Sequence, residues 1–194
     1  MKKLIVLALS IGIIALGSKA QNSIENLKFD KTRLNEEEKS IKKVKRMDRK
    51  ALRKLQGNTV NQNAKDNFRN DFGNVQQLVW SREENYDEAN FIKDGQAHTA
   101  FYDADAKLVG SSVNKKFSDL PGKAQKFINK NYSGYSIGDV IYYDDNEANE
   151  TDMLLYGTQF EDEDSYFVEL KIANHKIVLQ VDTNGIVSLF KKLY

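Results

Sequence analysis

Apolar residues recur four positions apart in two short segments of the chain. The first segment carries Val60, Ala64, Phe68 and Phe72, and the second carries Leu120, Ala124, Ile128 and Tyr132. This spacing places the apolar side chains on one face of an α-helix. A glycine follows each segment, at Gly73 and at Gly134, and glycine at this position favours the end of a helix. The pattern therefore predicts two similar short helices.

Each predicted helix is followed by strand-like segments in the same order. In the first copy they cover residues 75–80, 86–92 and 97–102, and in the second copy residues 137–143, 166–172 and 177–181. The turn Asp94-Gly95 is matched by Asn174-His175, and the turn 103–106 by 182–185. Asp-Gly and Asn-Gly favour tight hairpins, because both turn residues reach positive φ. Ala106 resists positive φ, so we expect its turn to differ or to be strained.

The matching order predicts an α+β fold built as a tandem repeat of one helix and an antiparallel β-meander. The first repeat covers residues 58–113 and the second covers residues 114–194. The second repeat contains an acidic insertion over residues 144–164, whose apolar middle predicts an added strand. The pattern allows the two copies either to pack together or to join their sheets side by side.

The N-terminal residues 1–20 have the features of a secretory signal peptide. A basic start is followed by an apolar run from Leu4 to Leu16, which is too short to span a bilayer. Small residues precede the junction between Ala20 and Gln21, where we expect cleavage. We expect the next residues, 21–34, to form a loose leader, since they show no clear periodicity.

A basic amphipathic helix is predicted over residues 35–57. Asn35 is placed to cap it, three glutamates fill its first turn, and Gly57 ends it. Its candidate partner-binding residues are Lys42, Lys43, Lys45 and Arg46. In one interpretation this basic face is simply solvated. In a second it is a docking surface, either for an acidic partner or for an anionic lipid surface. In a third it pairs with the acidic insertion, within one molecule or between two copies of the protein.

Composition narrows the class of protein. Without the three lysines of the predicted signal peptide, the formal net charge of +1 becomes −2, which gives no case for a nucleic-acid partner. The chain has no cysteine, so after export its core alone must stabilise it. After the predicted signal peptide, no segment is apolar enough to cross a membrane. We therefore expect a periplasmic or secreted protein.

The sequence lacks the motifs of catalysis and argues against an enzyme. Its two histidines, His98 and His175, do not form a metal-binding pair, and we expect both to be structural. No organic cofactor is indicated. Calcium is the remaining chemical hypothesis, with Asp144, Asp145 and Glu147 as candidate ligands, although the full ligand spacing of a calcium loop is missing. The aspartates that begin the hairpin turns are expected to cap those turns.

Aromatic residues on the predicted strands are candidates for partner binding. Trp and Tyr dominate the strongest contacts of protein interfaces. Trp80 and Tyr142 are the two that we select. Most of the aromatic side chains on these strands should nevertheless lie in the core or in cross-strand pairs.

Together these residues resemble a known family. Trp80, the segments 86–95 and 100–106, Leu120-Pro121 and the helix end at 129–132 are similar to the PepSY-like, beta-lactamase-inhibitor-like family of small exported proteins, found chiefly in bacteria of the Bacteroidetes type. The resemblance covers about residues 58 to 192 and leaves the basic helix outside. It implies a tandem α+β fold and a periplasmic or secreted location. The family name implies protein binding or inhibition.

We therefore expect an exported, non-enzymatic binding module whose partner is another envelope or secreted protein. Two other hypotheses stay open. One is a periplasmic protein that responds to calcium or to a small ligand, and the other is a self-assembling protein in which basic helix and acidic insertion pair between copies. The pattern leaves the target and the oligomeric state open.

Overall fold

The computed structural model describes residues 2–160 and 163–193. The chain divides into two compact units, Met1–Asp48 and Arg49–Tyr194. Within the described residues, no helix combines the length and the apolar character that a membrane crossing requires.

The first unit is a single helix. Helix α1 covers Lys2–Gln56, and its last eight residues belong to the second unit. The expected loose leader at 21–34 and the expected helix start at Asn35 are therefore wrong, because both lie inside α1. The segment 21–34 contains no glycine or proline, so nothing in it stops a helix. The predicted end is confirmed, since Gly57 follows α1 at a φ of 76°.

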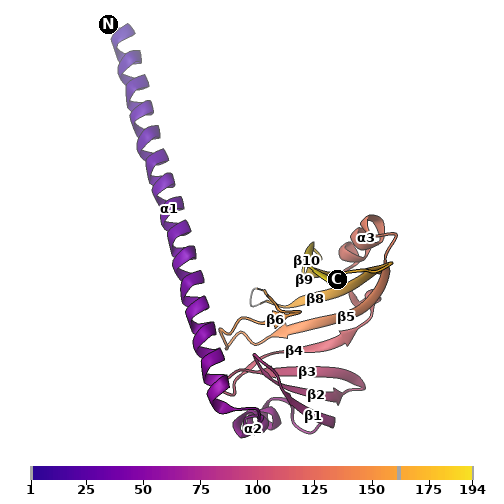
Figure 1. Cartoon of the computed structure of the whole chain (residues 1–194). Coiled ribbons are helices and arrows are strands. Elements are labelled where there is room, and N and C mark those ends of the chain that lie inside the picture. Colours follow the sequence, from indigo (N-terminus) through magenta and orange to yellow (C-terminus); the bar gives the residue numbers. More distant parts are fainter. Residues whose placement is uncertain (1, 161–162, 194) are drawn as a thin grey trace. The chain divides into compact units, whose positions relative to one another are not determined.

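Besides the end of α1, the second unit contains the helices α2 and α3 and an antiparallel sheet (Figure 1). The first half has α2 (Gln62–Phe72), β1 (Gln76–Arg82), β2 (Asp87–Lys93), β3 (Gln96–Tyr102) and β4 (Leu108–Lys115). The second half has η1 (Phe117–Asp119), α3 (Gly122–Asn131), β5 (Ser136–Asp145), β8 (Ser165–Ile172), β9 (His175–Asp182) and β10 (Val187–Leu193). Between β5 and β8, the acidic insertion forms a small hairpin, β6 (Leu154–Leu155) with β7 (Thr158–Gln159).

The two halves share one continuous sheet. Eight strands follow each other in the order β1-β2-β3-β4-β5-β8-β9-β10, and β4 pairs with β5 at the centre. The structure thus chooses the side-by-side alternative for the repeated α-then-β unit. The α+β class and the helix-plus-meander order of each half are confirmed.

Both short helices cover the same face of the sheet. Helix α2 places Ala64 and Phe68 on Ala89, Phe91 and Tyr102. Helix α3 places Ala124 and Ile128 on strands β5, β8 and β9, and Leu120, just before the helix, joins the same cluster. One row of cross-strand partners, His98, Val113, Tyr142, Tyr166 and Val181, runs from the first cluster to the second and joins them on one side.

The acidic insertion covers part of the opposite face. Met153 and Phe160 of the insertion are buried against Tyr143, Phe167 and Val178, which point away from the helices. Phe160 meets the rings of Tyr143 and Phe167 at 5.1 and 4.9 Å between centroids. The insertion is therefore a covering element of the fold and not only a solvated loop.

The turns 103–106 and 182–185, which are similar in sequence, are also similar in structure. Asp103 accepts hydrogen bonds from the backbone N–H groups of Asp105 and Lys107, and Asp182 accepts one from Ile186. The expected turn capping by these aspartates is confirmed. Ala106 takes a φ of 62°, close to the 76° of Gly185, so the turn is of the same kind and Ala106 carries the strain.

One turn differs from the prediction. In the β8–β9 hairpin, Ile172 pairs with His175, so the turn residues are Ala173 and Asn174. His175 begins strand β9, and Ala173 takes the positive φ of 47°. The register of β8 on β9, set by burying Val168 and Leu170 opposite Leu179 and Ile177, overrides the local turn preference.

Candidate functional site

The face of the sheet opposite the helices remains open over β2, β3 and β4. Its side chains there are Asn90, Ile92, Ala97, Thr99, Ser112 and Asn114, which we call the open sheet face. They line a hollow of about 330 Å³ together with Gln77 of β1. Amide and hydroxyl groups predominate, so this surface offers hydrogen-bond donors and acceptors rather than an apolar patch.

The sheet holds these side chains in fixed rows. Asn90 is opposite Thr99, and Thr99 is opposite Ser112. The Thr99 hydroxyl donates to the Asn90 side-chain oxygen at 2.8 Å. The same row continues to Tyr143, which is already buried under the insertion. The insertion therefore forms one border of the open sheet face.

The predicted aromatic residues lie on the helix side instead. Trp80 is half-buried and packs on Phe68 and Tyr102, with centroids 5.5 and 5.8 Å apart. The ring of Tyr142 packs at a tilt on that of Tyr166, with centroids 4.7 Å apart, and its hydroxyl donates to the Asp164 carboxylate at 2.8 Å. Burial, followed by the hydrogen bond and charge of Asp164, raises the pKa of Tyr142. Both side chains have structural contacts, and their roles in partner binding stay predictions.

The predicted basic residues belong to the first unit. Lys43 and Lys45 are exposed on α1, and Lys42 lies 3.9 Å from Glu38 one turn earlier. The side chain of Arg46 is outside the described part of the chain, as are those of Ala20 and Gln21 at the predicted cleavage site. The apolar residues expected on the same helix, Ile41, Val44 and Met47, are exposed as well.

The predicted calcium ligands do not gather into a site. Asp144 and Asp145 end strand β5, where their side chains alternate between the two faces, and Glu147 is exposed in the insertion. Burial is the main cause that raises the pKa of Asp144 and of Asp145, and the charge of Asp164 adds to it. Among the described residues, no three acidic or histidine side chains are grouped as metal ligands. Calcium binding remains a hypothesis.

Sequence reasoning missed a buried charge network in the first half of the fold. The carboxylate of Asp87 is fully buried and accepts hydrogen bonds from Arg53 at 3.2 Å, from Arg82 at 3.0 Å and from the Asn61 N–H at 3.0 Å. Arg53 also donates to the Glu83 carbonyl at 3.1 Å. The network ties the end of α1, the start of α2 and the β1–β2 turn together. Because these three segments are distant in sequence, no local sequence pattern predicts that they meet.

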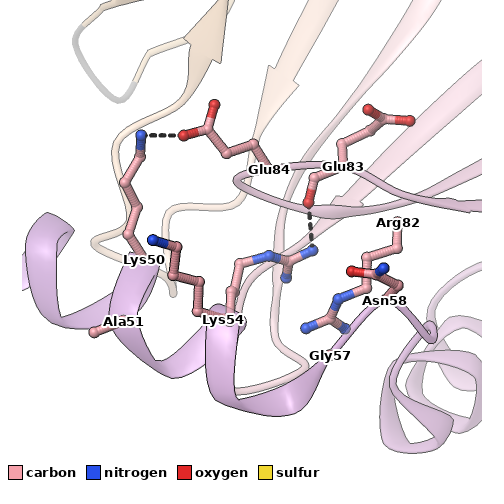
Figure 2. A pocket seen from close by; sticks show the side chains of 9 residues that line it. Lys50, Ala51, Lys54, Gly57, Asn58, Arg82, Glu83 and Glu84 are labelled. Atoms are coloured by element: carbon pink, nitrogen blue, oxygen red, sulfur yellow. Dashed lines mark hydrogen bonds and ion pairs between the residues drawn. The ribbon is translucent and has the colours of Figure 1, made fainter.

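A cavity of about 520 Å³ adjoins this network, and we call it the basic cavity (Figure 2). Its lining residues are Lys50, Ala51, Arg53, Lys54, Gly57, Asn58, Arg82, Glu83 and Glu84. Figure 2 shows Lys50 reaching from α1 to Glu84 of the β1–β2 turn, with which it forms an ion pair. The cavity thus lies between the last turns of α1 and that turn, inside the second unit.

Comparison with solved structures finds the same fold in proteins from Bacteroides. A DUF2874 family protein from Bacteroides uniformis is 15% identical, with a TM-score of 0.56 over 70% of this chain and 89% of that one. A BLIP-like protein from Bacteroides fragilis is 17% identical, with a TM-score of 0.55 over 72% of this chain and 92% of that one. A candidate periplasmic protein from Bacteroides eggerthii is 12% identical, with a TM-score of 0.56 over 70% and 88%.

The other comparisons add no relative. No protein-family model matches the chain, and a search of curated protein sequences also finds no match. At these identities the structural likeness establishes the fold alone. The chain therefore has the fold of the DUF2874 and BLIP-like proteins of Bacteroides, in agreement with the resemblance to the beta-lactamase-inhibitor-like family, while nothing in these matches bears on the PepSY part of that resemblance.

Proposed function

We propose that this protein is an exported, non-enzymatic binding module that engages another envelope or secreted protein through its open sheet face. The observation that carries the proposal is the unequal cover of the sheet. Helices α2 and α3 occupy one face, the insertion occupies part of the other, and the polar rows on β2–β4 are left open beside a hollow.

The chemistry of the open sheet face suits a partner that must be bound and released. Interfaces between proteins that also exist apart are about as polar as the rest of the surface. Asn90, Thr99, Ser112 and Asn114 are held by cross-strand pairing, so ordering them on binding costs little entropy. The likeness to a BLIP-like protein supports a protein as the partner, and inhibition of that partner is part of the proposal.

The basic helix supplies a second contact in this proposal. Lys42, Lys43, Lys45 and Arg46 are expected to make the affinity sensitive to salt, because exposed charges are screened within about 10 Å at ~0.1 M salt. Reversal of the four to Glu should weaken capture at low salt and change it little at high salt. Equal capture by the reversed and the original chain would remove the helix from the interface.

Site-specific photo-crosslinking tests the sheet-face proposal. A photoreactive residue replaces Thr99 on the open sheet face, and in a matched variant it replaces exposed Lys126 on α3. Both variants are expressed in the organism of origin. We expect one adduct of discrete size from position 99 and none from position 126. Equal adducts at both positions, or adducts at neither, would overturn the assignment of the face.

Inhibition is tested on the partner that the crosslink identifies. Saturating amounts of this protein should lower the activity of that partner. Substitution of Asn114 by Arg, which places a bulky charge on the open sheet face, should relieve the effect. An unchanged activity at saturation would leave a binding module without an inhibitory role.

A further inference from the structure

The basic cavity contains a buried guanidinium with unused hydrogen-bond donors. Arg53 is only 5% exposed, and its Nε and Nη1 atoms have no hydrogen-bond partner among the described residues. A guanidinium has five N–H donors, and the hydrogen bonds of Arg53 to the Glu83 carbonyl and to Asp87 both use Nη2. Buried donors without partners are rare and costly in folded proteins.

The buried guanidinium of Arg53 is also affected by the charges around it. Burial lowers the pKa of Arg53, the charge of Asp87 opposes this, and the charge of Arg82 adds to the lowering. The neighbouring carboxylates Asp87 and Asp103 therefore do not fully offset the loss of solvent around the Arg53 guanidinium. A stable buried cation needs either a full set of acceptors or an anion that completes them.

The cavity lining has a small excess of positive charge. The lining carries four cations, Lys50, Arg53, Lys54 and Arg82, and two carboxylates, Glu83 and Glu84, while the carboxylate of Asp87 that Arg53 holds lies outside the lining. Two further carboxylates act on this region from outside the cavity lining. The pKa of Glu88 is raised by burial and by Glu83, and Asp103 accepts a hydrogen bond from Thr151, to which Arg49 donates.

From this geometry we infer that the basic cavity is a binding site for a ligand carrying a carboxylate group. Arg53 is the central donor, and Lys54 and Lys50 are the cations at the rim. The same guanidinium groups already hold one carboxylate, that of Asp87.

Size and access agree with such a ligand. A volume of about 520 Å³ lies in the range of small-molecule sites. The Nε and Nη1 atoms of Arg53 are covered in this structure, so a ligand in the cavity reaches them only if lining side chains move, and the lining residues Lys54 and Glu83 are exposed. The site is separate from the open sheet face, so it stands independently of the proposed protein partner.

Titration of the full-length chain, followed by the NMR signal of the Arg53 Nε–H group, tests this inference. The carboxylate probes are succinate and the peptide acetyl-Gly-Asp-Gly-amide. Inorganic phosphate is the competing oxyanion, and sodium chloride at equal ionic strength is the control. We expect saturable shifts of the Arg53 signal with a Kd on the order of 1 mM for a carboxylate. The tighter of the two carboxylate probes then distinguishes a free acid from an acidic peptide.

Three variants connect the signal to the cavity. Lys54→Ala removes a rim cation without touching the network and should weaken carboxylate binding about threefold to tenfold. Arg53→Lys keeps a cation beside Asp87 but loses donors, and should abolish saturable binding while the chain stays folded. Lys126→Ala on α3 should change nothing. The inference is overturned if phosphate binds more tightly than both carboxylates, if chloride produces the same shifts, or if Lys54→Ala binds as the original chain does.

Discussion

Removal of the Asp87 carboxylate should destabilise the fold more than removal of any surface charge. In Asp87→Ala, the guanidinium groups of Arg53 and Arg82, whose side chains are 5% and 7% exposed, lose their shared counter-ion. Breaking a buried ion pair by deleting one partner costs about 3–5 kcal/mol, because the remaining charge stays buried and unpaired. Domains of this size are stable by only about 5–15 kcal/mol. The variant should therefore lie close to the limit of folding.

Urea unfolding, followed by fluorescence, measures this loss. Trp80 is the one tryptophan of the chain, and it packs on Phe68 and Tyr102 in the same half of the fold as Asp87. Its emission should shift when that half unfolds. The free energy of unfolding follows from linear extrapolation of the transition.

Asp66→Ala is the matched control. Asp66 and Arg69 form an ion pair of 2.7 Å on α2, with side chains 53% and 71% exposed. Exposed pairs contribute about 0–1 kcal/mol, so this loss should be small. If Asp87→Ala costs no more than Asp66→Ala, the buried network does not hold the end of α1 to the sheet, and the reasoning is refuted.

Three further predictions concern pH, a turn and calcium. Burial raises the pKa of Glu169, but the ion pair with Lys176 and the hydrogen bond from Tyr156 outweigh this and lower the pKa below its ordinary value. The stability that Glu169 contributes is therefore complete above its ordinary pKa and is lost as the pH falls through the lowered value. Lys176→Met should flatten this acid dependence of the urea midpoint, and an unchanged slope would argue against the pair. Gly185→Ala should cost about 1–3 kcal/mol in urea unfolding, because φ is 76° and a Cβ would lie 3.0 Å from Pro121; a neutral result would contradict the turn geometry. Millimolar calcium should leave the melting temperature unchanged, because Asp144 and Asp145 are consecutive residues of β5 and their side chains point to opposite faces of the sheet; a clear rise would support them as ligands.

The repeated fold could be predicted because its signals are local. Helix stripes such as Ala64–Phe68 and Ala124–Ile128 and the turn Asp94-Gly95 each depend on neighbouring residues, and the structure contains these three features, whereas the Asn174-His175 turn is shifted by one residue. Turn capping by Asp103 follows from the same local chemistry. Strain at Ala106 was also expected, because alanine disfavours positive φ. The hydrogen bonds that the Asp103 side chain accepts in this turn outweigh the cost of that strain.

The parts that were missed depend on contacts far apart in sequence. The network of Arg53, Arg82 and Asp87 joins segments about 30 residues apart, and one arginine among many basic residues on α1 has no local mark of burial. Trp80 could not be assigned to a face without the register of β1 on β2, in which it is opposite Ala89 under α2. The insertion was identified from its acidic residues, but it packs on the sheet through two apolar residues, Met153 and Phe160.

The most direct test of the proposed function is the comparison of crosslinking at position 99 with crosslinking at position 126. One discrete adduct from the open sheet face, absent from α3, is the predicted result. Its band should fade when Asn114 is replaced by Arg in the same chain, because both residues line one hollow. Adducts that form equally from α3, or that persist with Asn114→Arg, would contradict the account of this protein as a binding module that acts through its open sheet face.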